Sequence, residues 1–223
     1  MKKTLYHGSP SIVRKPLFGL GKPYNDYGQG FYCTEVLDLA KEWSVDLGRN
    51  GFANVYELEM KGLKVLDLQR DDFCILHWLS VLLRNREFEL DTDLAADAKE
   101  YILSHFPVET EDVDVIMGYR ADDSYFTFAR NFLNGAITLA KLSEAMRLGK
   151  LGVQIMVKSE KAFDRLSFVD ALPTLADEWY PHKKGRDDEA RRSYRESRAV
   201  RERNGLYISR ILDEELTADD LRI

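Results

Sequence analysis

Residues 28–44 read GQGFYCTEVLDLAKEWS and pass within a few positions from glycine-rich coil to a strand and then to a helix. Residues 31–34 carry aromatic and β-branched side chains, which favour strands. Leu39, Trp43 and Leu47 recur at every fourth position, which predicts an amphipathic helix over residues 38–47. Residues 17–30 are dense in Gly, Pro, Asn and Asp and therefore predict an irregular loop.

Strands are expected on both sides of this unit. Turn formers follow His7, so a short strand is predicted to end at that histidine. Residues 54–59 alternate in polarity and residues 65–68 favour a strand, and the turn between them predicts a hairpin or another strand pair. Further strands are predicted at residues 114–118, 153–158 and 166–169.

Helical patterns separate these strands. A helical insert is predicted at about residues 71–110, and its second helix, over residues 91–106, begins at an Asp91 or Thr92 cap. The order of elements lacks the βα alternation of a doubly wound fold. The sequence therefore predicts an α+β fold with a largely antiparallel sheet, in one domain over residues 1–223 with a C-terminal helical extension from about residue 172. The other helices are predicted at residues 73–86, 124–132, 138–148 and 186–203.

Composition excludes several classes of protein. The chain has 223 residues, 44% of them hydrophobic, and its longest nearly apolar run, residues 73–83, is shorter than the roughly 20 residues that span a bilayer. We therefore expect no membrane association. Two cysteines, Cys33 and Cys74, are too few for a disulfide framework, and no apolar export signal follows the N-terminal lysines, so a cytoplasmic location is expected.

Net charge argues against a surface built for nucleic acid, because the chain carries a formal charge of -6. Residues 182–203 depart from this trend, with nine basic and five acidic side chains. Mixed signs at helical spacing are typical of a solvated helix with ion pairs between neighbouring turns. A helix directed at nucleic acid is the alternative interpretation of the same residues.

Three short pieces occur in a recognisable order: Leu5-Tyr6-His7-Gly8-Ser9, then residues 28–34, then Ala40-Lys41-Glu42-Trp43-Ser44. They resemble the nicotinamide-binding half of the ADP-ribosyltransferase superfamily, in its branch with a His, Tyr and Glu triad. The whole chain more closely resembles a bacterial family called domain of unknown function 3990 (DUF3990), through residues 118–125, 148–152, 158–162 and 207–208. The resemblance implies an ADP-ribosyltransferase-like split, mainly antiparallel sheet, NAD as the substrate, and no metal.

The resemblance implies His7, Tyr32 and Gln154 as catalytic residues. His7 corresponds to the histidine that hydrogen-bonds a hydroxyl of the adenosine-side ribose, with Ser9 beside it, and Gly8 to the backbone that pairs with the nicotinamide carboxamide. Tyr32 corresponds to the tyrosine that stacks on the nicotinamide ring, whose positive charge favours an aromatic face. A histidine that caps a turn is the simpler interpretation of His7 taken alone.

Trp43 takes the place of a second aromatic side chain, which in eukaryotic relatives closes the other face of the ring. A core position beside Leu39 and Leu47 is the alternative, and the two are compatible because a pocket wall is also core. The loop before Tyr32 is placed to cover the cofactor, although a plain surface loop is the alternative. The further NAD contacts that the resemblance implies are Asp26, Gly28, Gly30 and Thr34.

Gln154 stands where active transferases carry a glutamate that holds the nicotinamide-side ribose and stabilises positive charge in the transition state. An amide can hold a hydroxyl, but it has no charge and takes no proton. Glu160 is the nearest carboxylate along the chain, and residues 158–161 are read more simply as a turn or helix cap. Asp122 and Asp123 are likewise more simply a helix N-cap than a metal site.

Two functions from different classes follow. The first is a mono-ADP-ribosyltransferase-like protein that binds NAD and moves ADP-ribose to a protein or nucleic-acid acceptor. Family analogy alone gives this protein the role of a toxin with a small antitoxin protein as partner. The second is a catalytically inactive protein that uses the same slot to bind NAD or a partner, because the triad glutamate is missing.

Overall fold

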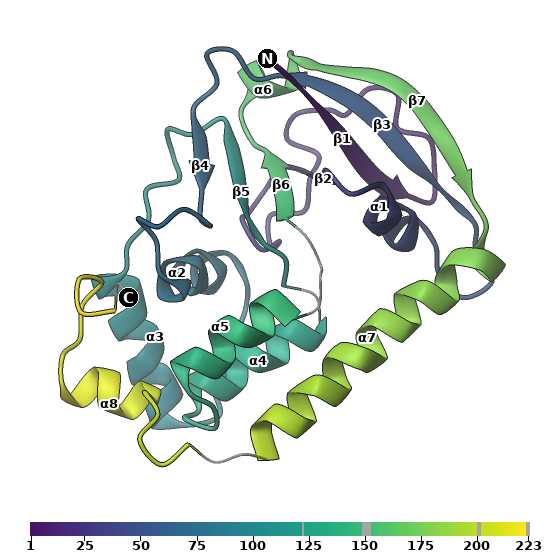
Figure 1. Ribbon diagram of the computed structural model, residues 1–223. Coiled ribbons are helices and arrows are strands. Elements are labelled where there is room, and N and C mark those ends of the chain that lie inside the picture. Colours follow the sequence, from purple (N-terminus) through teal and green to yellow (C-terminus); the bar gives the residue numbers. More distant parts are fainter. Residues whose placement is uncertain (122, 149–152, 200–201, 222–223) are drawn as a thin grey trace.

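The computed structural model describes residues 1–121, 123–148, 153–199 and 202–221. Its strands form one seven-stranded sheet, and most of its helices gather along one side of that sheet (Figure 1). The strands are β1 (Lys2–Ser9), β2 (Phe31–Thr34), β3 (Gly51–Glu59), β4 (Val65–Asp67), β5 (Val115–Tyr119), β6 (Val153–Val157) and β7 (Leu166–Thr174). The helices are α1 (Leu37–Ser44), α2 (Ile75–Asn85), α3 (Asp93–His105), α4 (Asp123–Leu133), α5 (Leu139–Leu148), α6 (Glu160–Phe163), α7 (Ala176–Ala199) and α8 (Ile208–Asp213).

The strand order is β4-β5-β6-β2-β1-β3-β7. All neighbouring strands are antiparallel except β4 and β5, which are parallel. The predicted mixture of helices with a largely antiparallel sheet is therefore confirmed. The strand predicted at residues 31–34 forms with those bounds, and Thr92 caps α3 by accepting a hydrogen bond from the Ala95 N–H.

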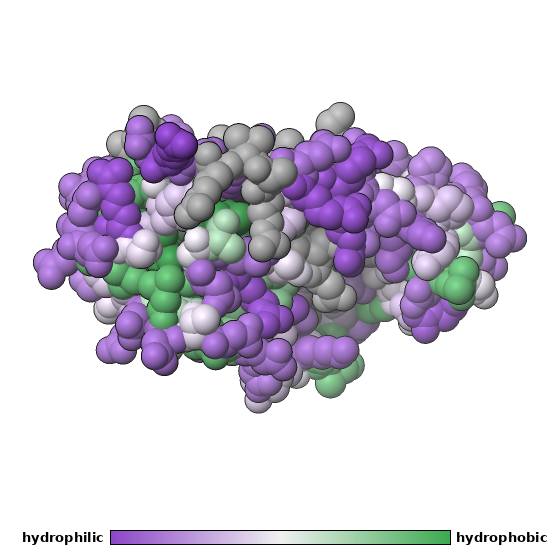
Figure 2. Space-filling view, turned by 90° about the horizontal axis from the view of Figure 1, so that it is seen from below, coloured by the Kyte–Doolittle hydropathy of each residue, from purple (hydrophilic) through white to green (hydrophobic). Residues whose placement is uncertain are grey.

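Both faces of the sheet are covered. The larger core lies between the sheet and the helices and contains the fully buried side chains of Trp78 and Phe132. A smaller core on the other face contains Leu5 and Cys33, with Phe163 of α6 packed against it. Figure 2 views the helical side from outside, where hydrophilic residues prevail and apolar ones form separate patches. In the described ranges, no helix has the length and apolar character needed to span a bilayer.

Strand β1 is paired unequally along its two edges. With β3 it forms eight antiparallel residue pairs, from Lys2↔Glu59 to Ser9↔Phe52. With β2 its register contains a single pair, Tyr6↔Thr34. On its other side, every residue of β2 pairs with β6. The sheet is therefore continuous, but one residue pair joins its two halves at the centre.

The predicted hairpin of residues 54–59 with residues 65–68 is wrong. β4 lies at the opposite end of the sheet from β3 and pairs with β5. A turn does form at residues 60–63, but the chain then crosses to the far edge of the sheet. There the Asp114 carboxylate accepts a hydrogen bond from the Lys64 backbone N–H at 2.7 Å, which ties the start of β4 to β5.

Asp114 is a buried carboxylate that joins three segments of the chain. Besides Lys64, the Ser159 hydroxyl donates to it at 2.6 Å and the Lys161 ammonium lies 3.0 Å away. Burial favours the neutral acid, but these hydrogen bonds and the Lys161 charge outweigh it and lower the pKa of Asp114 to about 2. This contact is not visible in local sequence patterns, which explains why the hairpin was the wrong inference.

Helix ends differ from the predictions where tertiary contacts decide them. α1 ends at Ser44, and Leu47 is 77% exposed instead of completing the apolar stripe. Just past the helix, Lys183 of α7 donates to the Val45 carbonyl at 2.8 Å. α7 itself begins at Ala176 rather than at residue 186, because its first turns pack against α1.

Three strands, β1, β3 and β7, are longer than predicted, and one predicted cap cannot be placed. β1 continues to Ser9, so His7 lies inside the strand. β7 continues to Thr174, past the expected start of the C-terminal helices. Asp122 lies outside the described residues, and α4 begins at Asp123.

Candidate functional site

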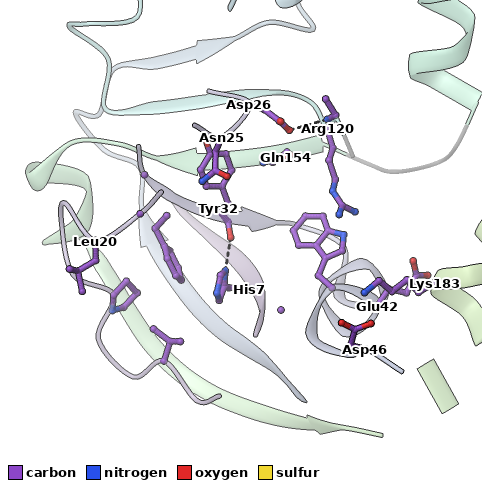
Figure 3. A pocket seen from close by; sticks show the side chains of 18 of the residues that line it. His7, Leu20, Asn25, Asp26, Tyr32, Glu42, Asp46, Arg120, Gln154 and Lys183 are labelled. Carbon is purple, nitrogen blue, oxygen red and sulfur yellow. Dashed lines mark hydrogen bonds between the residues drawn. The ribbon is translucent and has the colours of Figure 1, made fainter. Parts of the chain in front are cut away.

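A cavity of about 940 Å³ lies where β1 and β2 separate (Figure 3). β2 lines it with Phe31 and Tyr32. Tyr32 packs against the helix-side core and Phe31 against the smaller core, so side chains from both faces of the sheet meet here. The volume is within the ~300–1,000 Å³ of pockets that hold small molecules and cofactors.

Four of the predicted site residues meet in this cavity from four different elements. His7 comes from β1, Tyr32 from β2, Trp43 from α1 and Gln154 from β6. Asp26 and the two glycines Gly8 and Gly30 line it as well. Ser9, Gly28 and Thr34 do not.

These three residues have structural roles beside the cavity. The Ser9 hydroxyl accepts a hydrogen bond from the Ser11 N–H at 3.3 Å. Thr34 is fully buried at the junction of β1, β2 and β6. Gly28 has a φ of 86°, a left-handed conformation that favours glycine, and it forms part of the loop over Tyr32.

His7 bridges the gap between the separated strands. Its Nδ1 lies 2.7 Å from the Tyr32 carbonyl oxygen. Since a carbonyl only accepts hydrogen bonds, Nδ1 carries the proton. Burial lowers the pKa of His7, against the smaller opposing effect of the Tyr32 hydrogen bond, so the ring is neutral at pH 7. Nε2 is then a hydrogen-bond acceptor, which suits a ligand hydroxyl.

Tyr32 presents its ring to the cavity and its hydroxyl to the preceding loop. The hydroxyl donates to the Gly28 carbonyl at 2.6 Å and accepts from the Tyr27 N–H at 3.1 Å. Burial raises the pKa of Tyr32, so the hydroxyl stays protonated. The hydroxyl therefore holds the loop, and the ring is the part available to a ligand.

Asp26 fixes the same loop to the segment that follows β5. Asp26 is 5% exposed. Its carboxylate lies 3.3 Å from the Arg86 guanidinium and accepts a hydrogen bond from the Ala121 N–H at 3.0 Å. The loop is thus tied at both the Tyr32 hydroxyl and the Asp26 carboxylate. Asp26 lines the cavity, but these contacts make it a structural anchor of the wall.

Trp43 and Gln154 each place a buried polar atom without a hydrogen-bond partner in the wall of the cavity. The atoms are the Trp43 indole Nε1 and the Gln154 Oε1. The Arg120 guanidinium is 4.6 Å from the centroid of the Trp43 ring. A buried polar group without a partner costs about 1–3 kcal/mol. A ligand that both accepts and donates hydrogen bonds would satisfy both atoms.

Gly8 has a second role besides lining the cavity. A Cβ at this position would lie 2.1 Å from the Ala40 carbonyl oxygen and 2.7 Å from the Ser44 nitrogen, both in α1. Helix α1 therefore packs directly on the backbone of β1. The glycine that the resemblance assigned to ligand contact is required for this packing in any case.

Glu42 lines the cavity but was not predicted. It is 4% exposed, and both of its oxygens bind Arg186 of α7, at 2.8 and 2.9 Å. The two residues are 144 positions apart, so no local pattern connects them. The one sequence signal is that Glu42 follows Leu39 by three positions and so shares the buried side of α1.

The lining is more basic than the chain as a whole. It contains seven basic and four acidic side chains. Each of the four carboxylates lies within ion-pair distance of a basic side chain. The pairs are Asp26 with Arg86, Glu42 with Arg186, Asp46 with Arg49, and Asp187 with Arg191. A cavity with this balance favours an anionic ligand such as a phosphate ester.

Glu160 does not line the cavity. It is the exposed first residue of α6, and the preceding Ser159 caps that helix by accepting from the Ala162 N–H at 3.1 Å. The helix-cap interpretation of this segment is confirmed. Within the ranges that the structure describes, no group of three or more His, Cys, Asp or Glu side chains is placed to hold a metal ion.

The family model described as protein of unknown function, DUF3990, matches residues 3–168. The chain belongs to this family. The match includes the parts of β1, β2, α1 and β6 that line the cavity of this DUF3990 protein, and it ends before α7. No curated protein and no solved structure matches the chain.

Proposed function

We propose that this DUF3990 protein is an ADP-ribosyltransferase-like protein that binds NAD in the cavity and moves ADP-ribose to a protein or nucleic-acid acceptor. The meeting of His7, Tyr32, Trp43 and Gln154 in one cavity carries the proposal. Their two unpartnered buried polar atoms and the neutral His7 ring suit a ligand with hydroxyl and carboxamide groups. The excess of basic lining residues suits a pyrophosphate.

Each side chain has a role in this chemistry. The bond between the nicotinamide nitrogen and the ribose breaks, nicotinamide leaves, and positive charge develops on the ribose as the acceptor attacks and loses its proton. Tyr32 and Trp43 hold the nicotinamide ring between aromatic faces. His7 Nε2 accepts from a hydroxyl of the adenosine-side ribose, and Gln154 Oε1 accepts from a hydroxyl of the ribose at the reacting centre.

A catalytically inactive NAD- or partner-binding protein is the second candidate, and one observation favours it. β6 offers the Gln154 amide in place of a carboxylate, and each of the four carboxylates that line the cavity is already beside a basic side chain. No lining carboxylate in the described residues therefore stands unpaired to take a proton or to stabilise positive charge.

A toxin role belongs to the first candidate. Its support is family analogy alone, and it brings a small antitoxin protein as a partner. The ADP-ribose acceptor would have to reach the mouth of the cavity. Loss of cell growth on expression, relieved by Tyr32→Ala, is the outcome that the toxin role requires.

Substitution of Gln154 separates the two candidates. Gln154→Glu keeps the shape of the side chain and adds negative charge where the transition state becomes positive, so NAD turnover should rise on the order of tenfold or more. NAD binding is measured by titration and turnover by release of nicotinamide. Gln69→Glu, at an exposed turn, is the matched control for the same change of charge, and Tyr32→Ala is the control for a damaged pocket.

Four outcomes are informative. Binding and release by the wild-type protein support the transferase, whereas binding without release supports the inactive protein. Absence of NAD binding overturns the transferase and the NAD-binding form of the inactive protein, and leaves only the partner-binding form. A Gln154→Glu protein that binds NAD normally but gains no turnover shows that Gln154 does not occupy the position of the triad glutamate.

A further inference from the structure

Helix α7 lies outside the family match and yet forms one wall of the cavity. The match ends at residue 168, and α7 begins at Ala176. Its lining residues include Tyr180, Lys183 and Arg186. Figure 1 shows α7 running past α1 toward α4 and α5 as a single long helix. The cavity of this chain therefore includes side chains that lie beyond the family match.

The ion pair of Arg186 with Glu42 joins α7 to α1. Arg186 Nε lies 2.9 Å from Glu42 Oε2, and Arg186 Nη2 lies 2.8 Å from Oε1, so the pair is bidentate. Glu42 is 4% exposed, which removes most of the competition from water. A bidentate guanidinium fixes both the position and the orientation of a carboxylate.

Two further contacts hold the same turn of α1 from both sides of Glu42. The Lys41 ammonium lies 4.3 Å from the centroid of the Trp179 ring of α7. The Lys183 ammonium donates to the Val45 carbonyl at 2.8 Å, just beyond the end of α1. Three contacts from one helix thus bracket Trp43 along the chain.

Glu42 is unsuited to a direct chemical step, although it lines the cavity next to Trp43. Both of its oxygens are bound by Arg186, and the positive guanidinium cancels the charge that would stabilise a cationic transition state. Breaking a buried ion pair leaves an uncompensated charge. The pair is therefore a fixed structural link between the two helices.

We propose that Arg186 is a positioning residue, which holds the Trp43 wall of the cavity in place through Glu42. The effect on NAD binding rests on the proposed function, but the position of Trp43 does not. The indole of Trp43 follows the orientation of the last turn of α1, and that turn is held by α7. Helix α7, which lies outside the family match, thus sets the width of the slot between Tyr32 and Trp43.

Fluorine NMR of the full chain labelled with 5-fluorotryptophan tests this proposal without any ligand. The chain contains three tryptophans, and Trp43→Phe assigns the Trp43 signal. Trp78 is fully buried in the core and reports on folding. Arg186→Gln and Glu42→Gln each weaken the pair from one side, and Arg192→Gln, an exposed position on the same helix, is the control.

We expect Arg186→Gln and Glu42→Gln to shift and broaden the Trp43 signal while the Trp78 signal stays in place. Arg186→Lys should give an intermediate shift, since an ammonium keeps the charge but cannot form the bidentate contact. An unchanged Trp43 signal in either glutamine variant that keeps the Trp78 signal overturns the proposal, as does an equal shift in Arg192→Gln. If Arg186→Gln fails to fold, Glu42→Gln decides alone.

Titration of the same variants with NAD then tests whether the position of Trp43 affects NAD binding. We expect the affinity of Arg186→Gln for NAD to fall roughly tenfold, by analogy with metal sites, where loss of an outer-shell partner costs about tenfold or more. Normal NAD affinity together with a shifted Trp43 signal would show that the position of the indole does not govern binding, and would overturn the functional half of the proposal. If the wild-type protein does not bind NAD, the proposed function fails, and the NMR result still decides the role of Arg186.

Discussion

Along its β3 edge, strand β1 forms eight residue pairs, whereas along its β2 edge it forms one. The first edge is an ordinary antiparallel ladder in which backbone groups satisfy one another. At the second edge the ladder stops where the cavity begins. There the Tyr32 carbonyl accepts a hydrogen bond from His7 Nδ1, where a complete ladder would supply a backbone N–H. We call the β3 side the closed edge of β1 and the β2 side its open edge. A cavity in the middle of a sheet thus requires a side chain to replace the missing backbone partner.

The closed edge uses a side chain in a different way. Asn54 of β3 is fully buried, and its amide donates to the His7 carbonyl at 3.3 Å and to the Ser11 carbonyl at 3.2 Å. Its Oδ1 accepts from the Val13 N–H at 2.9 Å. Here a side chain folds the following loop back onto an intact ladder. At the open edge the histidine spans a gap, and its second nitrogen remains an acceptor for a ligand.

The largest expected effect comes from closing the space between β1 and α1 with Gly8→Ala. The new Cβ would lie 2.1 Å from the Ala40 carbonyl, a backbone atom that cannot turn aside. We expect the free energy of unfolding to fall by about 3 kcal/mol, the upper end for overpacking. Urea denaturation followed by circular dichroism measures this change.

Gly185→Ala is the matched control for Gly8→Ala. No atom lies within 4 Å of a Cβ placed at Gly185, which is inside α7. Alanine is the better helix former, so this variant should be about 0.5–1 kcal/mol more stable than the wild-type protein. A Gly8→Ala protein as stable as the wild type would show that α1 does not rest on β1 as described.

Removal of the bridge at the open edge has the next largest effect. His7→Ala leaves the Tyr32 carbonyl without its partner, and an unsatisfied group of this kind costs about 1–3 kcal/mol. His182→Ala, at an exposed position of α7, should change the free energy of unfolding by less than about 0.5 kcal/mol. Equal effects of the two substitutions, measured by urea denaturation, would contradict a bridging role for His7.

Local patterns predicted the elements whose causes are local. The strand at residues 31–34 and the Thr92 cap follow from neighbouring side chains, and both form as expected. The place of β4 depends on Asp114, 50 positions away from Lys64, and the end of α1 depends on Lys183. Contacts of this length leave no periodic trace in one sequence.

The site shows the same division. His7, Tyr32 and Trp43 belong to short motifs that predict a binding site, and all three line the cavity. Glu42 and Arg186 form a pair across 144 positions, which no local pattern predicts. The mixed charges of residues 182–203 predict a solvated helix. Arg186 and Lys183 nevertheless turn inward, because Arg186 binds the Glu42 carboxylate and Lys183 donates to the Val45 carbonyl just past α1.

Two substitutions at Tyr32 distinguish the role of its ring in the cavity from the role of its hydroxyl in holding the loop. Tyr32→Phe removes only the hydroxyl that binds Gly28 and Tyr27, which should cost about 0.5–1.5 kcal/mol of unfolding free energy. Tyr32→Ala also removes the ring, and we expect NAD affinity to fall by a further one to two decades, since stacking on an aromatic ring is worth about 1–3 kcal/mol. Equal NAD affinities for the two variants would show that the ring does not hold the ligand.

The smallest expected effect is the dependence of stability on pH at the open edge. Burial lowers the pKa of His7 in the folded chain below its ordinary value of 6.5, so the unfolded chain binds more protons between the two values. The contribution of His7 to stability is therefore complete above pH 6.5 and is lost as the pH falls toward the folded pKa. A difference of one unit between the folded and unfolded pKa is worth only about 1.4 kcal/mol of unfolding free energy.

His7→Asn supplies a side-chain N–H that does not titrate, so the unfolding free energy of this variant should fall less than that of the wild type between pH 6.5 and 5. Parallel curves for the two proteins, from urea denaturation at each pH, would show that the open edge does not hold His7 neutral.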